Sequence, residues 1–149
     1  MQRPERDRGR ILIVEDDSMV MELITTRLIL AGYVTYSARN GTLALERIAE
    51  LKPNAMILDI NMPGLDGFGV LRKLKETGVI AHLPTLVLTA RNSPGDVRRA
   101  VTLGARDYLA KPFSDEQLLG RVARLVRKVS PAPSAPRRDM PEDSDALML

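Results

Sequence analysis

The stretch AMILDINMPGLDG, residues 55–67, decides the fold of this chain. It begins with an uninterrupted apolar run, AMIL, that leads into Asp59 and then into a turn-rich segment around Pro63. A short apolar run bounded by turn residues is typical of a strand buried on both faces of a sheet. Because such strands occur where helices cover both faces of the sheet, this stretch predicts an α/β fold.

The same pattern recurs on both sides of this stretch. Apolar runs of strand length alternate with segments whose apolar residues repeat at helical spacing. The predicted strands are residues 10–14, 33–37, 55–59, 85–89 and 106–110, and the predicted helices are about 19–30, 41–51, 67–77, 94–103 and 115–129. Five strands alternating with five helices predict a doubly wound (βα)5 flavodoxin-like sandwich around a five-stranded parallel sheet.

The ends of the chain differ from this repeating region. Residues 1–9 are charged, and residues 130–149 are rich in proline and then acidic, with little apolar content before the last four residues. Segments of this composition bury too little apolar surface to offset the entropy lost on ordering. We therefore expect one folded domain over residues 10–129, between a disordered N-terminal segment and a disordered tail.

The composition narrows the classes of function. The net charge is only +3 and aromatic residues make up 3% of the chain, which argues against direct binding of nucleic acid. No apolar stretch approaches the ~20 residues needed to cross a bilayer, and the charged N-terminus does not look like a signal peptide. The chain has no cysteine, which agrees with a reducing compartment. From these features together we expect a cytoplasmic protein that does not associate with membranes.

Polar side chains follow four of the five predicted strands. Glu15 and Asp16 come after the first strand, Asp59 ends the third, and Thr89 and Lys111 lie at the ends of the fourth and fifth. The second strand supplies no such residue, which fits a position at the edge of the sheet. Because ligands of doubly wound sheets bind at the carboxyl ends of the strands, we expect these side chains to meet there.

The chemistry of this set points to a metal ion and a phosphoryl group. Three neighbouring carboxylates raise one another's pKa unless a cation lies among them, and a few carboxylates with a carbonyl and waters are typical ligands of Mg2+. Lys111 and Thr89 are suited to hold phosphoryl oxygens. Together these groups indicate phosphoryl transfer to a carboxylate, with Asp59 as the nucleophile.

Each of these residues has a simpler explanation when it is taken alone. Asp59 is then a turn residue or a helix cap, Thr89 a strand residue and Lys111 a solvated surface group. Their joint occurrence at four strand ends is what indicates a shared site. A calcium-binding loop starting at Asp59 is rejected, because Pro63 and Val70 occupy positions where such loops carry oxygen ligands. His82, the only histidine, is expected in a surface turn beside Pro84.

Over residues 10–129 the sequence resembles the receiver domain of two-component response regulators, of the stand-alone, single-domain type. The resemblance lies in four motifs and in the spacing between them: ILIVEDD, LDINMPGLDG, LVLTA and DYLAKPF. The resemblance implies that Asp59 is the phosphoacceptor. It also implies that Mg2+ is bound by Glu15 through water, by Asp16, by Asp59 and by the backbone carbonyl of Asn61. Side chains at the positions of Asn61 and Arg91 tune the lifetime of the phosphate in this family.

The resemblance assigns roles to the other strand ends as well. Thr89 is expected to bind the phosphoryl group and to act as a switch residue, and Lys111 is expected to pair with that group. Tyr108 matches an aromatic residue that swings inward on activation. Pro112 matches a proline that follows a cis peptide bond.

The implied function is a signalling switch. A histidine kinase or histidine phosphotransfer protein donates the phosphoryl group to Asp59, and a surface built from the fourth helix, fifth strand and fifth helix then changes and controls a protein partner. No enzymatic activity beyond self-phosphorylation and slow autodephosphorylation is expected. A haloacid-dehalogenase-type phosphatase is disfavoured, because Asn61 stands where such enzymes need an acid/base aspartate.

Three questions stay open from the sequence. The chain is either a stand-alone switch, a receiver fragment of a larger regulator whose output domain is absent, or an interaction module that does not cycle phosphate. The basic face of the last helix is either solvated or a docking surface; its residues are Arg121, Arg124, Arg127 and Lys128. A monomer or a weak dimer is expected, since only Asp107, Arg121 and Lys128 match the charges through which related regulators dimerise.

Overall fold

The computed structural model of the protein describes residues 8–90 and 93–127. The predicted tail from residue 130 lies outside the described residues, as do Arg91 and the predicted N-terminal segment up to residue 7. Arg8 and Gly9 are described, and the backbone N–H of Arg8 donates to the carbonyl of Gly32 at 3.1 Å. No helix within the described residues is both long and apolar enough to cross a membrane.

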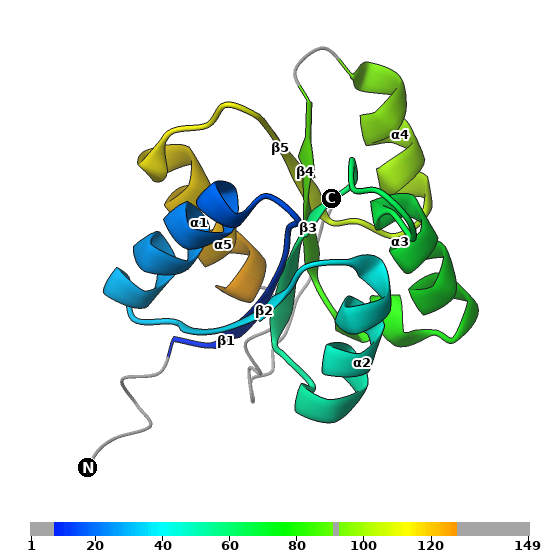
Figure 1. The fold of residues 1–149 in the computed structure, drawn as a ribbon, viewed down its shortest axis with the longest axis horizontal. Helices are drawn as coiled ribbons and strands as arrows, with labels where there is room; N and C mark the ends of the chain where they lie inside the picture. The colour runs from blue at the N-terminus through cyan, green and yellow to red at the C-terminus, as the bar shows by residue number, and fades with distance from the viewer. Residues whose placement is uncertain (1–7, 91–92, 128–149) are drawn as a thin grey trace, which may run out of the picture.

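Five parallel strands form one sheet in the order β2-β1-β3-β4-β5. Figure 1 shows α1 and α5 on one face of this sheet and α2, α3 and α4 on the other. The predicted (βα)5 sandwich is therefore confirmed, with β2 at an edge. In chain order the elements are β1 (Arg10–Val14), α1 (Ser18–Leu30), β2 (Val34–Ala38), α2 (Gly41–Leu51), β3 (Ala55–Asp59), α3 (Gly67–Glu76), η2 (Val79–His82), β4 (Thr85–Thr89), α4 (Pro94–Thr102), β5 (Asp107–Ala110) and α5 (Asp115–Arg127).

The central strands are buried because helices cover both of their faces. Every residue of β3 and β4 is buried, and successive side chains alternate between two apolar clusters. Met56 and Leu58 belong to the cluster beneath α2 and α3, whereas Ile57 belongs to the cluster beneath α1 and α5. Because the strands are parallel, their carboxyl ends lie at a common edge, where a site can form.

Side-chain caps fix the helix starts that follow the strands. The carboxylate of Asp17 accepts from two backbone N–H groups of α1, and Asn40 and Asp66 cap α2 and α3 in the same way. Ser114 and Gln117 form a capping box, the pattern that their spacing in the sequence predicts, with reciprocal bonds of 2.9 and 3.1 Å. These caps determine where the loops before α1, α2, α3 and α5 end, whereas α4 begins at Pro94 without a side-chain cap.

The face that α1 buries differs from the prediction. In the sequence, Met19, Leu23 and Leu28 recur at helical spacing, which predicts that they share one buried face. However, the exposed fractions of Met19 and Leu23 are 79% and 40%. Ile24 and Leu28 are the buried residues, as predicted. The helix carries apolar residues around much of its circumference, so their spacing alone does not identify the inner face.

Other differences concern the boundaries of elements and one short helix. The second and fifth strands each begin one residue later than predicted, and the second ends at Ala38 instead of Ser37. The turn predicted around His82 is a 3-10 helix, η2, which begins after Gly78 and ends before Pro84. Such short helices lack the longer periodicity that sequence patterns detect.

A pair of glycine substitutions tests the close packing of α2. A Cβ at Gly41, the first residue of α2, would lie 2.3 Å from the carbonyl oxygen of Leu65, whereas a Cβ at Gly120 would meet nothing within 4 Å. We expect Gly41→Ala to reduce the free energy of unfolding by about 1–3 kcal/mol, as overpacking does. Gly120→Ala, in an exposed helix interior, should increase it by about 0.5–1 kcal/mol. Urea denaturation followed by circular dichroism measures both, and equal effects would contradict the packing around Gly41.

Candidate functional site

Three carboxylates meet at the carboxyl edge of the sheet. Glu15 and Asp16 directly follow β1, and Asp59 is the last residue of the adjacent strand β3. One oxygen from each of the three side chains lies within 4.8 Å of the other two. The sheet therefore brings together the acidic residues that the sequence placed at separate strand ends.

Two of these carboxylates are removed from solvent. Glu15 is 1% exposed and Asp59 is 2% exposed, whereas Asp16 is exposed. The pKa of Glu15 is raised to about 7, chiefly by burial and then by the neighbouring Asp59, through hydrogen bonding and charge repulsion. The backbone N–H of Asp17 and the ammonium group of Lys111 lower it and only partly compensate. Negative charge at Glu15 is thus unfavourable near neutral pH without a further cation.

Lys111 joins the cluster from the position directly after β5, the strand at the opposite edge of the sheet from β2. Its Nζ lies 3.2 Å from Oε1 of Glu15 and 3.4 Å from Oδ2 of Asp59. Burial lowers the pKa of Lys111, but the charges of Asp59 and Glu15 outweigh burial and raise it. The backbone N–H of Lys111 donates to the carbonyl of Thr89 at 2.8 Å, and the Lys111–Pro112 peptide bond is cis.

The loop after β3 completes the oxygen-lined edge. The backbone N–H of Asn61 donates to Oδ1 of Asp59 at 2.9 Å, while its side chain is exposed. The backbone N–H of Asp17 similarly donates to Oε2 of Glu15 at 3.2 Å. These bonds orient the two buried carboxylates.

The donor set fits a hard divalent cation. The carboxylates of Glu15, Asp16 and Asp59 supply oxygen ligands only, and the raised pKa of Glu15 marks a site where a cation relieves repulsion. Asp16 makes no hydrogen bond or ion pair with any described residue, so its carboxylate is available as a ligand. Oxygen-only ligands of this number are typical of Mg2+.

Thr89 and Tyr108 both line a cavity next to the carboxyl edge of β4. Thr89, at the end of β4, is 1% exposed, and its hydroxyl makes no hydrogen bond with any described residue. A cavity of about 340 Å³ between β4, α4 and β5 is lined by Thr89 and Tyr108, among other residues. Tyr108 is 43% exposed. There is therefore free space between the hydroxyl and the aromatic ring.

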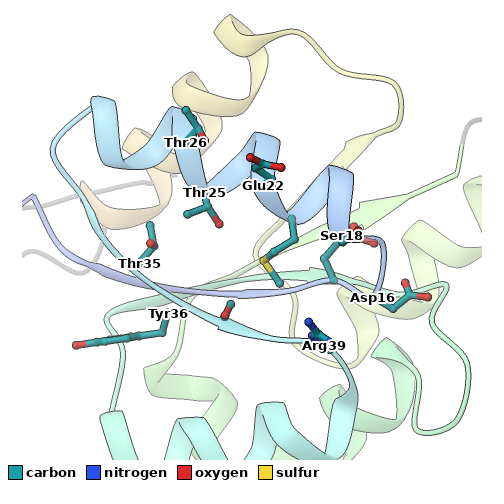
Figure 2. A pocket seen from close by; sticks show the side chains of 11 residues that line it. Asp16, Ser18, Glu22, Thr25, Thr26, Thr35, Tyr36 and Arg39 are labelled. Atoms are coloured by element: carbon teal, nitrogen blue, oxygen red, sulfur yellow. The ribbon is translucent and has the colours of Figure 1, made fainter.

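A larger cavity, of about 630 Å³, adjoins the acidic pair between α1 and β2. Figure 2 shows Asp16, Ser18 and Arg39 gathered toward one end of it, near the first turn of α1. Glu15 and Arg39 are both among the residues that line it. The sequence interpretation overlooked Arg39, because it assigned no functional residue to the second strand and ended that strand one residue early.

Most of the site residues inferred from the sequence share this edge. Glu15, Asp16, Asp59 and Lys111 form one cluster, and Thr89 lies on the strand between those of Asp59 and Lys111. The remaining residues are more peripheral or outside the described structure: Asn61 and Pro112 have exposed side chains, Tyr108 is turned partly to solvent, and Arg91 is not described.

Comparison with known proteins gives a consistent assignment. The family profile of the response regulator receiver domain matches residues 11–123. The response regulator MprA from Mycobacterium sp. (strain KMS) is 46% identical over 122 residues, which is 82% of this chain and 52% of that protein. The chain thus spans about half the length of the curated relatives it matches.

Solved structures agree with this match. A response regulator from Chloroflexus aurantiacus superposes with a TM-score of 0.76 at 35% identity, covering 80% of this chain and 98% of that one. The chemotaxis protein CheY4 from Vibrio cholerae gives 0.74 at 29% identity, covering 78% and 98%. Both similarities extend over nearly the whole length of the solved proteins.

The raised pKa of Glu15 predicts how stability changes with pH. The folded protein holds the Glu15 proton up to about pH 7, whereas the unfolded chain releases it near 4.5. This contribution to stability is complete below about pH 4.5 and is lost as the pH rises through about 7, at a cost of at most about 3 kcal/mol. Glu15→Gln, which cannot ionise, should lack this loss, so its stability relative to wild type should increase from pH 5 to pH 8 in the absence of divalent cations.

Urea denaturation at several pH values, with a chelator present, measures this difference. Millimolar Mg2+ should reduce it, because the ion stabilises the ionised carboxylate. Parallel pH profiles for wild type and Glu15→Gln would show that Glu15 titrates normally.

Proposed function

This chain belongs to the family of response regulator receiver domains, and on that premise we propose that it is a phosphorylation-activated switch in which Asp59 accepts the phosphoryl group. Receiver domains of this family are signalling modules of two-component systems rather than enzymes of metabolism. They bind Mg2+ at an acidic site and interact with histidine kinases and output partners.

One observation carries the proposal: Lys111 contacts both buried carboxylates, at 3.2 and 3.4 Å, next to the exposed carboxylate of Asp16. Burying two carboxylates at 1% and 2% exposure costs free energy. Their burial side by side therefore indicates a role that needs both of them. A set of three carboxylates and one ammonium group suits a site that gains a divalent cation and a phosphoryl group. A purely structural role would be served as well by apolar residues.

The proposed chemical step is an in-line displacement at phosphorus. An oxygen of Asp59 attacks the phosphorus of a phosphohistidine and forms a P–O bond, while the P–N bond breaks and its electron pair stays on the imidazole nitrogen. The N–H of Asn61, which donates to Oδ1 at 2.9 Å, keeps the carboxylate of Asp59 oriented and leaves Oδ2 on the side of Lys111.

Glu15, Asp16, Asp59 and the carbonyl of Asn61 are the proposed holders of Mg2+, with Glu15 acting through water. The ion supplies positive charge that offsets the charge developing on the transferred oxygens. Lys111 is proposed to move its ammonium group from the carboxylates to a phosphoryl oxygen. Asn61 and Arg91 stand at positions that tune the phosphate lifetime in the family that the sequence resembles, and they are proposed to set how long the phosphate lasts here.

The proposed switch uses the cavity between Thr89 and Tyr108. The hydroxyl of Thr89, at the end of β4, makes no hydrogen bond with any described residue, and a phosphoryl group on Asp59 offers it an acceptor on the neighbouring strand. Movement of Thr89 toward that group enlarges the 340 Å³ space, which then accepts the ring of Tyr108. Phosphorylation thereby favours a conformation in which Tyr108 is buried.

The surface that reports this change is formed by α4, β5 and α5. On it, Asp107 pairs with Arg121 at 3.0 Å and with Arg124 at 3.1 Å, and Arg121 also donates to the carbonyl of Tyr108. Two of the four residues on the basic face of the last helix, Arg121 and Arg124, are therefore paired within the chain. We propose that this surface binds a protein partner, with the paired charges of Asp107 disfavouring a dimer that needs them.

The phosphoryl donor is proposed to be a histidine kinase or a histidine phosphotransfer protein, in the cytoplasm. The relatives that match are about twice as long as the matched region, so a receiver that forms part of a larger regulator is an equally consistent form of the same function. The proposed domain itself covers residues 10–129. Whether it stands alone or forms part of a larger regulator, the proposed switch is this domain.

Phosphorylation by a small donor tests the proposal directly. Incubation with acetyl phosphate and Mg2+ should add one phosphoryl group to the protein, seen by intact mass spectrometry, and Asp59→Asn should abolish the adduct. Asp66→Asn is the matched control, because Asp66 lies in the same loop and only caps α3, a role that asparagine performs equally well. Its adduct should equal that of wild type.

Two outcomes would contradict this function. An adduct that survives Asp59→Asn would place the acceptor elsewhere. A wild-type protein that gains no phosphoryl group in the presence of Mg2+, although it is folded, would favour the interaction module that does not cycle phosphate.

A further inference from the structure

Arg39 lies beside the acidic pair through the register of the sheet. The last registered pair of β1 and β2 is Val14 with Ala38, so Arg39 follows one position beyond, next to Glu15. The backbone N–H of Glu15 donates to the carbonyl of Ala38 at 3.1 Å, which fixes this neighbourhood. Adjacent strands of a sheet are separated by only ~4.8 Å, so the backbone of Arg39 is close to that of Glu15.

The side chain of Arg39 faces the same space as the carboxylates. Arg39, Glu15 and Asp16 all line the cavity of about 630 Å³ between α1 and β2. In Figure 2, Arg39 and Asp16 lie at the end of the cavity near Ser18, whereas Thr26 and Thr35 lie farther along it. The guanidinium group is thus placed at the approach to the site.

Arg39 differs from most of the described arginines in having no partner among the described residues. Arg47 donates to the carbonyl of Ser37, Arg27 pairs with Asp115, and Arg121 pairs with Asp107. Arg39 is exposed and forms neither an ion pair nor a hydrogen bond with any described residue. Its charge is therefore not neutralised locally and acts on whatever enters the cavity.

The charge of the acidic cluster determines how a positive group at Arg39 affects the ligands of the site. Three carboxylates face a single ammonium group, so acidic groups outnumber basic ones at this edge. An anionic phosphoryl donor must approach against that charge, and Mg2+ is attracted by it. A positive group at the rim acts in opposite directions on these two ligands.

We propose that Arg39 is an electrostatic positioning residue of the phosphoacceptor site, which speeds the approach of anionic phosphoryl donors and weakens the binding of Mg2+. The proposal rests on the function assigned to Asp59 above. Because Arg39 is exposed, its influence should be modest and should fall with ionic strength. A solvated surface arginine without a role would show neither effect.

The test compares three proteins with wild type: Arg39→Gln, Arg39→Lys and Arg72→Gln. Arg72, on α3, is exposed and has no partner among the described residues, so its substitution removes the same charge without breaking a recorded contact. Titration calorimetry at low ionic strength measures the Kd of Mg2+. The rate of phosphorylation by acetyl phosphate, a dianion, is measured at saturating Mg2+ by intact mass spectrometry.

Arg39→Gln should bind Mg2+ roughly two- to fivefold more tightly and react with acetyl phosphate roughly two- to fivefold more slowly. Arg39→Lys, which keeps the charge, should stay close to wild type in both measurements. Arg72→Gln should also match wild type. At 0.5 M salt both differences should shrink, and thermal melting should confirm that all variants remain folded.

The proposal is overturned if Arg39→Gln matches wild type in both measurements, or if Arg72→Gln produces the same changes. It is also overturned if Arg39→Gln slows the reaction and weakens Mg2+ binding together, since structural damage acts in that way. Failure of wild type to be phosphorylated would instead refute the function assigned to Asp59. The Mg2+ titration would still decide whether the charge of Arg39 reaches the acidic pair.

Discussion

The close approach of three carboxylates at one edge of the sheet is the constraint on which the rest of the structure depends. Their mutual repulsion is tolerated because strands that are buried on both faces cannot shift apart without exposing the core. Lys111 supplies one positive charge, which does not balance the three carboxylates. The apolar sheet therefore maintains an edge that favours the binding of a cation.

The cluster lies between two cavities with different surroundings. The cavity of about 340 Å³ connects Thr89 to Tyr108 and so to the surface formed by β5 and α5. The cavity of about 630 Å³ connects Glu15 and Asp16 to Arg39 and the edge strand β2. One side of the site thus faces the proposed responding surface, and the other faces the entrance where Arg39 lies. In the proposed function, phosphoryl transfer thus takes place on one side of the site and the conformational response on the other.

Sequence patterns predicted the strands and the acidic cluster well because both follow from simple rules. Parallel strands must share a carboxyl edge, so the residues that end them, such as Asp59 and Lys111, had to meet. The same patterns failed for Met19, because the inner face of α1 is chosen by packing against α5 and the sheet rather than by spacing. Arg39 was missed because its significance depends on register with Glu15, and register is not visible in the sequence of one strand.

The anchoring of Lys111 has a consequence for how the domain returns to its starting state. Its backbone N–H is bonded to Thr89 on the neighbouring strand, while its ammonium group reaches the carboxylates through a flexible chain. Loss of a phosphoryl group would therefore require only rotations about side-chain bonds to restore the original contacts. Such rotations are fast compared with rearrangement of a packed backbone. In the proposed function, the return of Lys111 to its original contacts is therefore not the slow step of resetting.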